Sequence, residues 1–292
     1  MKRILFFLSL VSGLFVSGCL LSSCDKIDEP YTRGTGGANE TPYRLCIYLI
    51  EDSIVAPQKN NDPSVGPTPD WLDYVHNHLL RTSLNGTWGS IFTGGIDAEA
   101  DDTVKVTKKV LLEDFTGHLC INCPSAAEKA KELKTIYGEN LYIIAHHAGE
   151  FAEPQTSGNY TADFRNPSSN ELYAEFGITY NPVGLINRHE FNSQRRVGAG
   201  QWAAKIGEMM NQKTDIKITF SKNYQALTGL LEGNVKVRIS GKWFTQPFSI
   251  FMNVYDTNNW NANNCKLVAF VYEESSREIY QVEETDVYSG KK

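Results

Sequence analysis

The sequence predicts a chain of two structural parts, an α/β part followed by an all-β, sandwich-like part. Residues 109–145 show a strand, a helix and a second strand in that order, and from Asp215 onward apolar residues alternate with polar ones. The 292 residues allow about two domains, and 41% hydrophobic residues are typical of a globular protein. The net charge of −6 argues against nucleic acid as a partner, because phosphates require a basic surface.

The first 24 residues are predicted to be a lipoprotein signal peptide. Lys2 and Arg3 precede a short apolar run over residues 4–16. Small residues followed by a cysteine then occur twice, at Cys19 and at Cys24, and both sites resemble a bacterial lipobox, in which the cysteine becomes lipid-modified. We favour Cys24, with Cys19 as the alternative, because cutting before Cys24 leaves polar residues next to the lipid. An ordinary signal peptide that contains cysteines is the other interpretation.

The segment between the signal peptide and the α/β part has little regular pattern. Residues 25–42 are rich in Gly, Thr, Pro and charge and predict a flexible tether. Residues 44–50 are apolar and predict a strand, whereas four prolines in 57–70 predict a loop. Residues 71–84 fit a helix or a strand equally well. The acidic stretch 97–102 lacks the glycine and the spacing of a calcium loop, so we expect it to be solvated.

The α/β part begins with a strand–helix–strand unit. Residues 109–115 form a nearly continuous apolar run, which is typical of a strand buried on both faces. Apolar residues in 124–137 recur at helical spacing, with Pro124 suited to the first turn and Gly138 to the end. Residues 141–145 predict the second strand. Two strands joined by a helix are parallel by default, with a right-handed crossover.

Three further elements complete this part. Ser168 and Glu171 have the spacing of a capping box and predict a short helix that ends at Gly177. Residues 183–186 predict a strand. Residues 201–210 predict a helix with apolar side chains on one face.

The all-β part is predicted from alternating apolar residues. They alternate in three segments, 216–220, 235–239 and 248–254, and two more candidate strands follow at 266–272 and 278–282. Short alternating strands joined by turns imply a sandwich-like arrangement.

Cys120 and Cys123 form a CxxC pair between a predicted strand and a predicted helix start. The unpaired N–H groups of a helix N-terminus favour a thiolate, and the second cysteine is placed to attack a mixed disulfide made by the first. We therefore expect a redox pair in which Cys120 is the more exposed thiol with the lower pKa. A structural disulfide and half of a zinc site are the alternatives, but no second CxxC exists.

The histidines are weaker candidates. His146 and His147 follow the second parallel strand and lie on the side of the CxxC pair, where one of them could be a general base or tune a thiolate. We favour the alternative, a solvated or hydrogen-bonded loop pair. A protonated His118 could stabilise a Cys120 thiolate. His76 and His78 would share a strand face, but two ligands without a third make a poor metal site. We predict no metal and no bound cofactor.

Residues 106–213 resemble the thioredoxin superfamily. Asp114 lies six residues before the first cysteine, on the strand, where that family keeps a buried acid. Residues 173–182 resemble the family's helix end that leads to its cis-proline, which implies that Pro182 is cis and faces the CxxC pair. The sequence departs from the family at Leu119, where a tryptophan is usual, and in the Ile-Asn dipeptide between the cysteines.

The whole chain resembles a narrower family, the 28-kDa outer-membrane lipoproteins of Gram-negative bacteria. Residues 115–124 resemble its thioredoxin-like signature, and residues 264–271 resemble a strand of its C-terminal β domain. Three more segments match that domain, at 51–58, 74–81 and 85–89, but here they precede the thioredoxin-like part. The resemblance implies a lipid-anchored protein of the cell envelope at the outer membrane.

This displacement predicts that residues 43–105 and 214–292 form one β domain into which residues 106–213 are inserted. A lone strand at 44–50 could not bury its apolar side chains, and domains tolerate insertion where their termini meet. Two outcomes stay open for Cys46 and Cys265, a structural disulfide or two buried free thiols.

Two functions follow from this sequence. The first is a thiol–disulfide oxidoreductase acting on exported proteins, in which Cys120 attacks, Cys123 resolves, and Asp114 and Pro182 support the pair. The second is a non-enzymatic surface or binding lipoprotein that uses the thioredoxin fold as a scaffold.

Overall fold

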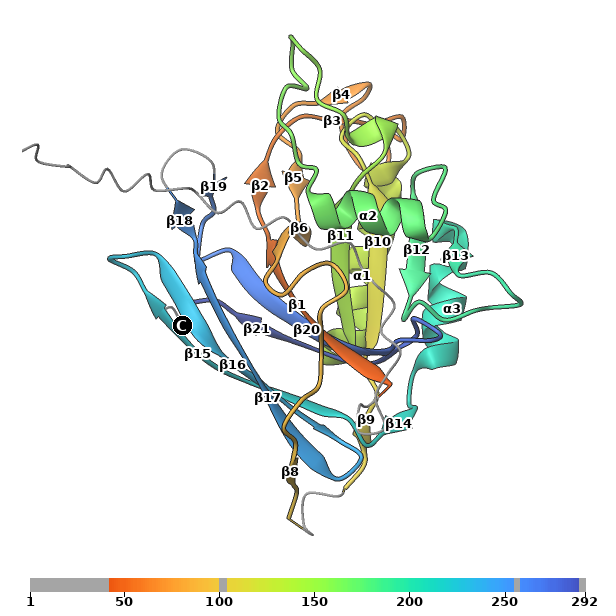
Figure 1. Ribbon diagram of the computed structural model, residues 1–292. Helices are drawn as coiled ribbons and strands as arrows, with labels where there is room; N and C mark the ends of the chain where they lie inside the picture. The colour runs from red at the N-terminus through yellow and green to blue at the C-terminus, as the bar shows by residue number, and fades with distance from the viewer. Residues whose placement is uncertain (1–41, 100–103, 255–257, 289–292) are drawn as a thin grey trace, which may run out of the picture. The chain divides into compact units, whose positions relative to one another are not determined.

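The computed structural model describes residues 42–99, 104–254 and 258–288 (Figure 1). The predicted signal peptide, both candidate lipidation cysteines and all of the predicted tether except Pro42 lie outside these ranges. Within them, no helix is long and apolar enough to cross a membrane. The described chain consists mostly of strands, arranged in one mixed sheet and several antiparallel sheets.

The mixed sheet has nine strands and runs in the order β13-β12-β10-β11-β6-β1-β20-β21, with β7 also paired to β1. The pairs β10–β11 and β11–β6 are parallel, and the other pairs are antiparallel. The strands are β1 (Tyr43–Glu51), β6 (Leu79–Ser83), β7 (Ser90–Ile91), β10 (Val110–Thr116), β11 (Leu141–His147), β12 (Val183–Ile186), β13 (Arg196–Val197), β20 (Cys265–Glu273) and β21 (Ile279–Asp286).

Strand β1 joins the early and late parts of the chain. The strand predicted at 44–50 is present, and it pairs with β20 along its whole length, from Tyr43 opposite Glu273 to Glu51 opposite Cys265. On its other side β1 pairs with β6, which in turn bridges to β11. One sheet therefore runs without a break from β21 to the parallel strands β11 and β10. The division into an inserted domain and a host domain stays a prediction.

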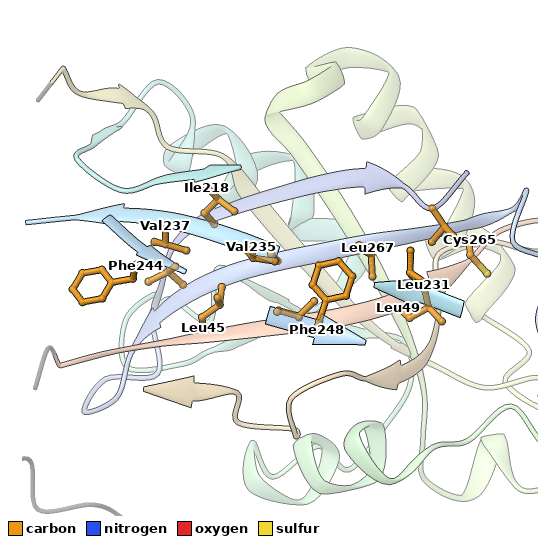
Figure 2. Close-up of a cluster of buried hydrophobic side chains, with 14 of the residues drawn as sticks. Leu45, Leu49, Ile218, Leu231, Val235, Val237, Phe244, Phe248, Cys265 and Leu267 are labelled. Atoms are coloured by element: carbon orange, nitrogen blue, oxygen red, sulfur yellow. The ribbon is translucent and has the colours of Figure 1, made fainter. Parts of the chain in front are cut away.

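A second sheet packs against β1 and β20. It is antiparallel, in the order β15-β16-β17-β8, with strands β15 (Lys217–Gln225), β16 (Leu230–Ile239), β17 (Lys242–Phe251) and β8 (Ile96–Asp97). Figure 2 shows Leu45 and Leu49 of β1 and Leu267 of β20 facing Val235 and Phe248 across the gap between the sheets. This two-layer core agrees with the sandwich-like packing that the alternating pattern predicts.

Short two-stranded ladders complete the strands. They are β2 (Ile54–Val55) with β5 (Val75–His76), β3 (Gln58–Lys59) with β4 (Asp70–Trp71), β9 (Val106–Thr107) with β14 (Lys213–Thr214), and β18 (Asn253–Val254) with β19 (Asn258–Asn259). Three of these strands, β3, β4 and β5, lie in the predicted loop of residues 57–70 and the ambiguous segment 71–84.

The helices match the predicted ones closely. They are α1 (Cys123–Tyr137), α2 (Pro167–Glu175) and α3 (Trp202–Met209), with short 3-10 turns η2 (Gly138–Asn140), η3 (Glu150–Ala152) and η4 (Ala199–Gln201). Helices α1 and α3 belong to one core with the strands β10 and β11. Ala126, Ala130 and Leu133 are the buried face of α1, and they share this core with Val110 and Ile143 of the sheet.

The predicted capping box of α2 is wrong. Asn166 caps the helix, and its side-chain oxygen accepts a hydrogen bond from the Ser169 N–H group. Ser168 instead bonds to the hydroxyls of Ser83 and Thr87, and Glu171 accepts a hydrogen bond from the Trp88 indole. Ser168 and Glu171 therefore bind residues within 83–88, from the end of β6 to just before β7, instead of capping the helix. A local sequence pattern does not show such contacts.

We expect Asn166→Ala to lower the free energy of unfolding by about 1–2 kcal/mol, because an N-cap side chain satisfies a helix N–H group that otherwise lacks a partner. The Asn166 amide also donates to the Leu80 carbonyl, which places the loss at the upper end. The exposed Asn170 in the same helix is the matched control, since Asn170→Ala removes the same side chain at a site without a cap. Equal losses for both variants in chemical denaturation would contradict the assignment of the cap.

Candidate functional site

Cys120 and Cys123 form a disulfide at the start of α1, with their Cα atoms 5.4 Å apart. Cys120 lies in the turn that follows β10, where its N–H donates to the Gly117 carbonyl, and Cys123 is the first residue of the helix. A Cβ at Gly117 would lie 2.4 Å from the Phe151 carbonyl carbon, so only glycine fits this turn. The two cysteines are 3% and 2% exposed. In this oxidised form the two exposures barely differ, and the expectation for the reduced protein, that Cys120 is the more exposed thiol with the lower pKa, stays a prediction.

Asp114 lies on β10, two residues before the strand ends. It is almost fully buried, and burial raises the pKa of its carboxyl to about 7. Its Oδ1 atom has no hydrogen-bond partner among the described residues. Strand alternation places Asp114 on the same face as Val110 and Leu112, which pack beneath α1. The carboxyl is thus held in an environment that favours its neutral form near pH 7.

Pro182 lies beside the end of β10, and the Asn181–Pro182 peptide bond is cis, as the resemblance implies. Strand β12 follows it directly and pairs antiparallel with β10, with Val183 opposite Phe115. The Asn181 side-chain amide donates to the carbonyls of Thr116 and Ala148, at 3.0 and 3.3 Å. These bonds fix the proline loop to the strand end from which the cysteine turn starts.

A cavity of about 290 Å³ opens next to Cys123. One wall is formed by α1, β10 and β11, and the other by residues 58–78. The lining includes the polar or aromatic side chains of Trp71, Tyr74, His76, Asp114 and His147 together with Cys123, but it does not include Cys120. His76 Nε2 and His147 Nδ1, like Asp114 Oδ1, have no hydrogen-bond partner among the described residues. Cys123 therefore adjoins a cavity whose lining includes three buried polar side chains, those of Asp114, His76 and His147.

His76, His118, His146 and His147 are buried, and burial favours their uncharged forms. Burial lowers the pKa of His118, and it lowers that of His76 to about 4. His118 is consequently not the cation that could stabilise a Cys120 thiolate. His146 and His147 are not a loop pair, because both lie in β11 and are fully buried.

The two histidines of β11 point to opposite faces of the sheet. His147 lines the cavity, whereas His146 lies on the other face, against Glu113 and the Ser169 hydroxyl of α2. His78 is paired with Asp52 rather than with a metal. Nowhere in residues 42–99, 104–254 and 258–288 do three or more His, Cys, Asp or Glu side chains come together as a metal site would require.

A segment that the sequence analysis treated as loop is bound to the cysteine turn. We call residues 58–62 the clamp segment. Its Lys59 and Asn61 N–H groups donate to the carbonyls of His118 and Ile121, at 2.8 and 3.0 Å. The Gln58 side chain donates to the carbonyl of Cys120 at 2.9 Å. No local signal predicts these contacts, because they join positions about sixty residues apart through backbone carbonyls.

Cys46 and Cys265 are free and buried, so the structural disulfide left open by the sequence does not form. Cys265 lies opposite Glu51, five residues along β1 from Cys46, which is a separation of roughly 16 Å along the strand. The two sulfurs also lie in different surroundings. Cys265 belongs to the core between the two sheets, whereas the Cys46 thiol contacts the Thr87 carbonyl on the other face of β1.

Comparison with known proteins gives limited matches. No family model matches the chain, and no curated protein matches it. Among solved structures, HBP35 of Porphyromonas gingivalis is similar at 14% identity and a TM-score of 0.48, over 62% of this chain and 75% of that chain. A structural-genomics protein of Agrobacterium tumefaciens is similar at 12% identity and a TM-score of 0.41, over 65% of this chain and 99% of that chain. Matches at this level say nothing about activity.

Proposed function

We propose that this chain is a lipid-anchored thiol–disulfide oxidoreductase of the cell envelope, with a thioredoxin-like core over residues 106–213. The observation that carries the proposal is the Cys120–Cys123 disulfide at the start of α1, next to the buried Asp114 carboxyl and its cavity. The parallel β10–β11 pair joined through α1 and the cis peptide bond before Pro182 support the thioredoxin-like assignment. The proposed substrates are the disulfides or thiols of exported proteins.

The reaction needs no bound cofactor. The Cys120 thiolate attacks one sulfur of a substrate disulfide, a mixed disulfide forms, and the other substrate sulfur leaves as a thiolate. Cys123 then attacks the Cys120 sulfur, which re-forms the Cys120–Cys123 bond and releases the reduced substrate. Asp114, with a pKa of about 7, is suited to take the proton from the Cys123 thiol before this second attack.

The location is part of the proposal. Lipidation at Cys24, or at Cys19 in the alternative, would anchor the chain, and the resemblance to 28-kDa outer-membrane lipoproteins places it at the outer membrane. The mass of the protein extracted from native membranes tests this. A lipidated N-terminus at Cys24 is the expected result, and an unlipidated soluble chain would contradict it.

The activity is tested by the reduction of insulin with dithiothreitol as the terminal reductant. We expect the wild-type chain to accelerate it, Cys120→Ser to abolish the acceleration, and Cys123→Ser to accumulate a mixed disulfide that is visible on a non-reducing gel. Cys46→Ser is the matched control and should keep full activity, because burial raises the pKa of the Cys46 thiol to about 12 and makes it unreactive.

A non-enzymatic binding lipoprotein is the second candidate. The burial of both cysteines, at 3% and 2% exposure, favours it, because an attacking thiol needs access to its substrate. If wild type reduces insulin no faster than Cys120→Ser, the binding function replaces the catalytic one.

A further inference from the structure

We propose that Gln58 is a positioning residue of the redox pair, which holds the turn carrying Cys120 in its disulfide-bonded geometry and so shifts the thiol–disulfide equilibrium toward the oxidised form. The inference rests on the proposed function for its biological meaning. The equilibrium itself is a property of the two cysteines and can be measured without any protein substrate.

The Gln58 side chain is aimed at the backbone of the cysteine turn. Its Nε2 atom lies 2.9 Å from the Cys120 carbonyl oxygen and 3.2 Å from that of Gly117, and it is also 3.0 Å from the Lys59 carbonyl oxygen. A primary amide has two hydrogens to donate. The carbonyls of Cys120, Gly117 and Lys59 therefore share the two hydrogens of the Gln58 amide. Gln58 is only 2% exposed, so water does not readily replace these bonds.

The rest of the clamp segment binds the same turn in register. The backbone N–H groups of Lys59 and Asn61 donate to the carbonyls of His118 and Ile121, one on each side of Cys120. The Asn61 side-chain amide donates to the Asn122 side-chain oxygen, and Ser125 of α1 donates to the Asp62 carboxylate, both at 2.9 Å. The turn is therefore held along its whole length by one strand-like segment.

The clamp segment also makes bonds to residues outside the cysteine turn, and these bonds fix the position of Gln58 independently of the turn. The Asn60 side chain donates to the carbonyls of Asp62, Gly66 and Pro67 and closes the loop that follows it. Lys59 and Tyr160 both contact the Asp70 carboxylate, and β3 pairs with β4. A donor fixed in this way loses little conformational entropy when it bonds to the turn.

Reduction changes what the clamp holds. It breaks the Cys120–Cys123 bond and adds two electrons and two protons, supplied by two thiols, such as two glutathione molecules, that are oxidised together to one disulfide. The two sulfurs are then no longer held at bonding distance, so the disulfide no longer constrains the turn between them. Because Gln58 bonds to the turn in its disulfide-bonded form, we infer that it favours the oxidised pair.

The experiment equilibrates the full chain with mixtures of reduced and oxidised glutathione and counts free thiols at Cys120 and Cys123 by alkylation and mass spectrometry. We expect Gln58→Ala to shift the equilibrium constant about tenfold toward the dithiol, which is about 30 mV for this two-electron couple. Gln58→Met retains the volume of the side chain without its donors and should give the same shift.

Gln281→Ala is the matched control. Gln281 is also 2% exposed, and its amide also donates to two backbone carbonyls, those of Thr107 and Ile216, but it lies on β21, away from the cysteines. We expect it to lower stability without moving the redox equilibrium. The proposal is overturned if folded Gln58→Ala and Gln58→Met keep the wild-type equilibrium, or if Gln281→Ala shifts it equally.

The two proposals can fail separately. A wild-type chain that does not reduce insulin, yet shows the tenfold shift in glutathione buffers, would refute the oxidoreductase and retain Gln58 as a positioning residue. An active wild-type chain with no shift in either Gln58 variant would refute only the role of Gln58.

Discussion

Arg188→Ala is expected to lower the free energy of unfolding by about 3–5 kcal/mol, because it leaves the Glu113 carboxylate buried without its counter-charge. The two side chains are fully buried, and the guanidinium makes two bonds of 2.7 Å to the two carboxylate oxygens. Burial by itself would raise the pKa of Glu113, but the adjacent Arg188 charge lowers it to about 2. The pair links β10 to the residues after β12.

The aromatic surroundings make the loss harder to repair. The Arg188 guanidinium carbon lies 5.3 Å from the ring centre of Phe176, 5.1 Å from that of Phe270 and 5.7 Å from that of Tyr272. Phe270 and Tyr272 belong to β20, and Glu113 belongs to β10, so the Arg188 cation contacts both strands. Removing the Arg188 side chain also removes these cation–π contacts and leaves a cavity between β10 and β20.

The matched control is Arg165→Ala. Arg165 makes the same two-pronged bond to the Asp163 carboxylate, at 2.9 and 3.0 Å, but at the surface, where such a pair contributes about 0–1 kcal/mol. The double variant Glu113→Gln/Arg188→Met should recover most of the loss, because it removes both buried charges. Urea unfolding at pH 7 measures all three variants. Equal small losses for Arg188→Ala and Arg165→Ala would contradict the prediction.

The penalty in Arg188→Ala should also depend on pH. Without the guanidinium, burial raises the pKa of Glu113, so the folded variant keeps a proton that the unfolded chain has lost. Its stability then falls as pH rises through this range, and the gap from wild type is larger at pH 8 than at pH 5.

The sequence was sufficient for elements with a strong local pattern. The apolar run at 109–115 and the helical spacing of 124–137 predict β10 and α1 to within one residue. The strand at 44–50 was also predicted, and its apolar residues on both faces reflect its burial between two layers. The CxxC pair was also found from a local pattern, whereas the buried acid and the cis-proline were implied by the resemblance to the thioredoxin superfamily.

What the sequence did not predict depends on contacts between distant residues. Asn166 caps α2 in place of the apparent capping box, since the Ser168 and Glu171 side chains have partners near β6 and β7. The proposed role of Gln58 becomes visible only in the structure, where its amide donates to the Cys120 carbonyl. Polar residues in a proline-rich stretch look solvated, and nothing local shows that one of them is 2% exposed.

Asp114→Asn is expected to stabilise the oxidised protein at pH 8 by about 2–4 kcal/mol relative to wild type, and to leave its stability little changed at pH 4. The folded-state pKa of Asp114 is about 7, against an ordinary value of 3.8, and the cause is burial. Between these values the folded state holds a proton that the unfolded state has released. The free energy of unfolding therefore falls as pH rises, by about 1.4 kcal/mol per pH unit at most, and the loss is complete above pH 7.

Asparagine keeps the shape of the side chain and removes its ionisation, so the variant should lose this slope. The nearby His76 and His147 add a slope of the opposite sign, because burial lowers their pKa values in the folded state. Both histidines are present in wild type and in Asp114→Asn, so the difference between the two curves reports on Asp114. Glu128→Gln is the control, since Glu128 lines the same cavity at its exposed rim. Denaturation of the disulfide-bonded protein from pH 4 to 8 measures the difference. Parallel curves for wild type and Asp114→Asn would mean that folding does not raise the pKa of the Asp114 carboxyl. A carboxylate that is already ionised below pH 5 would be too weak a base to take a proton from Cys123, so this stability measurement also tests the proton step of the proposed reaction.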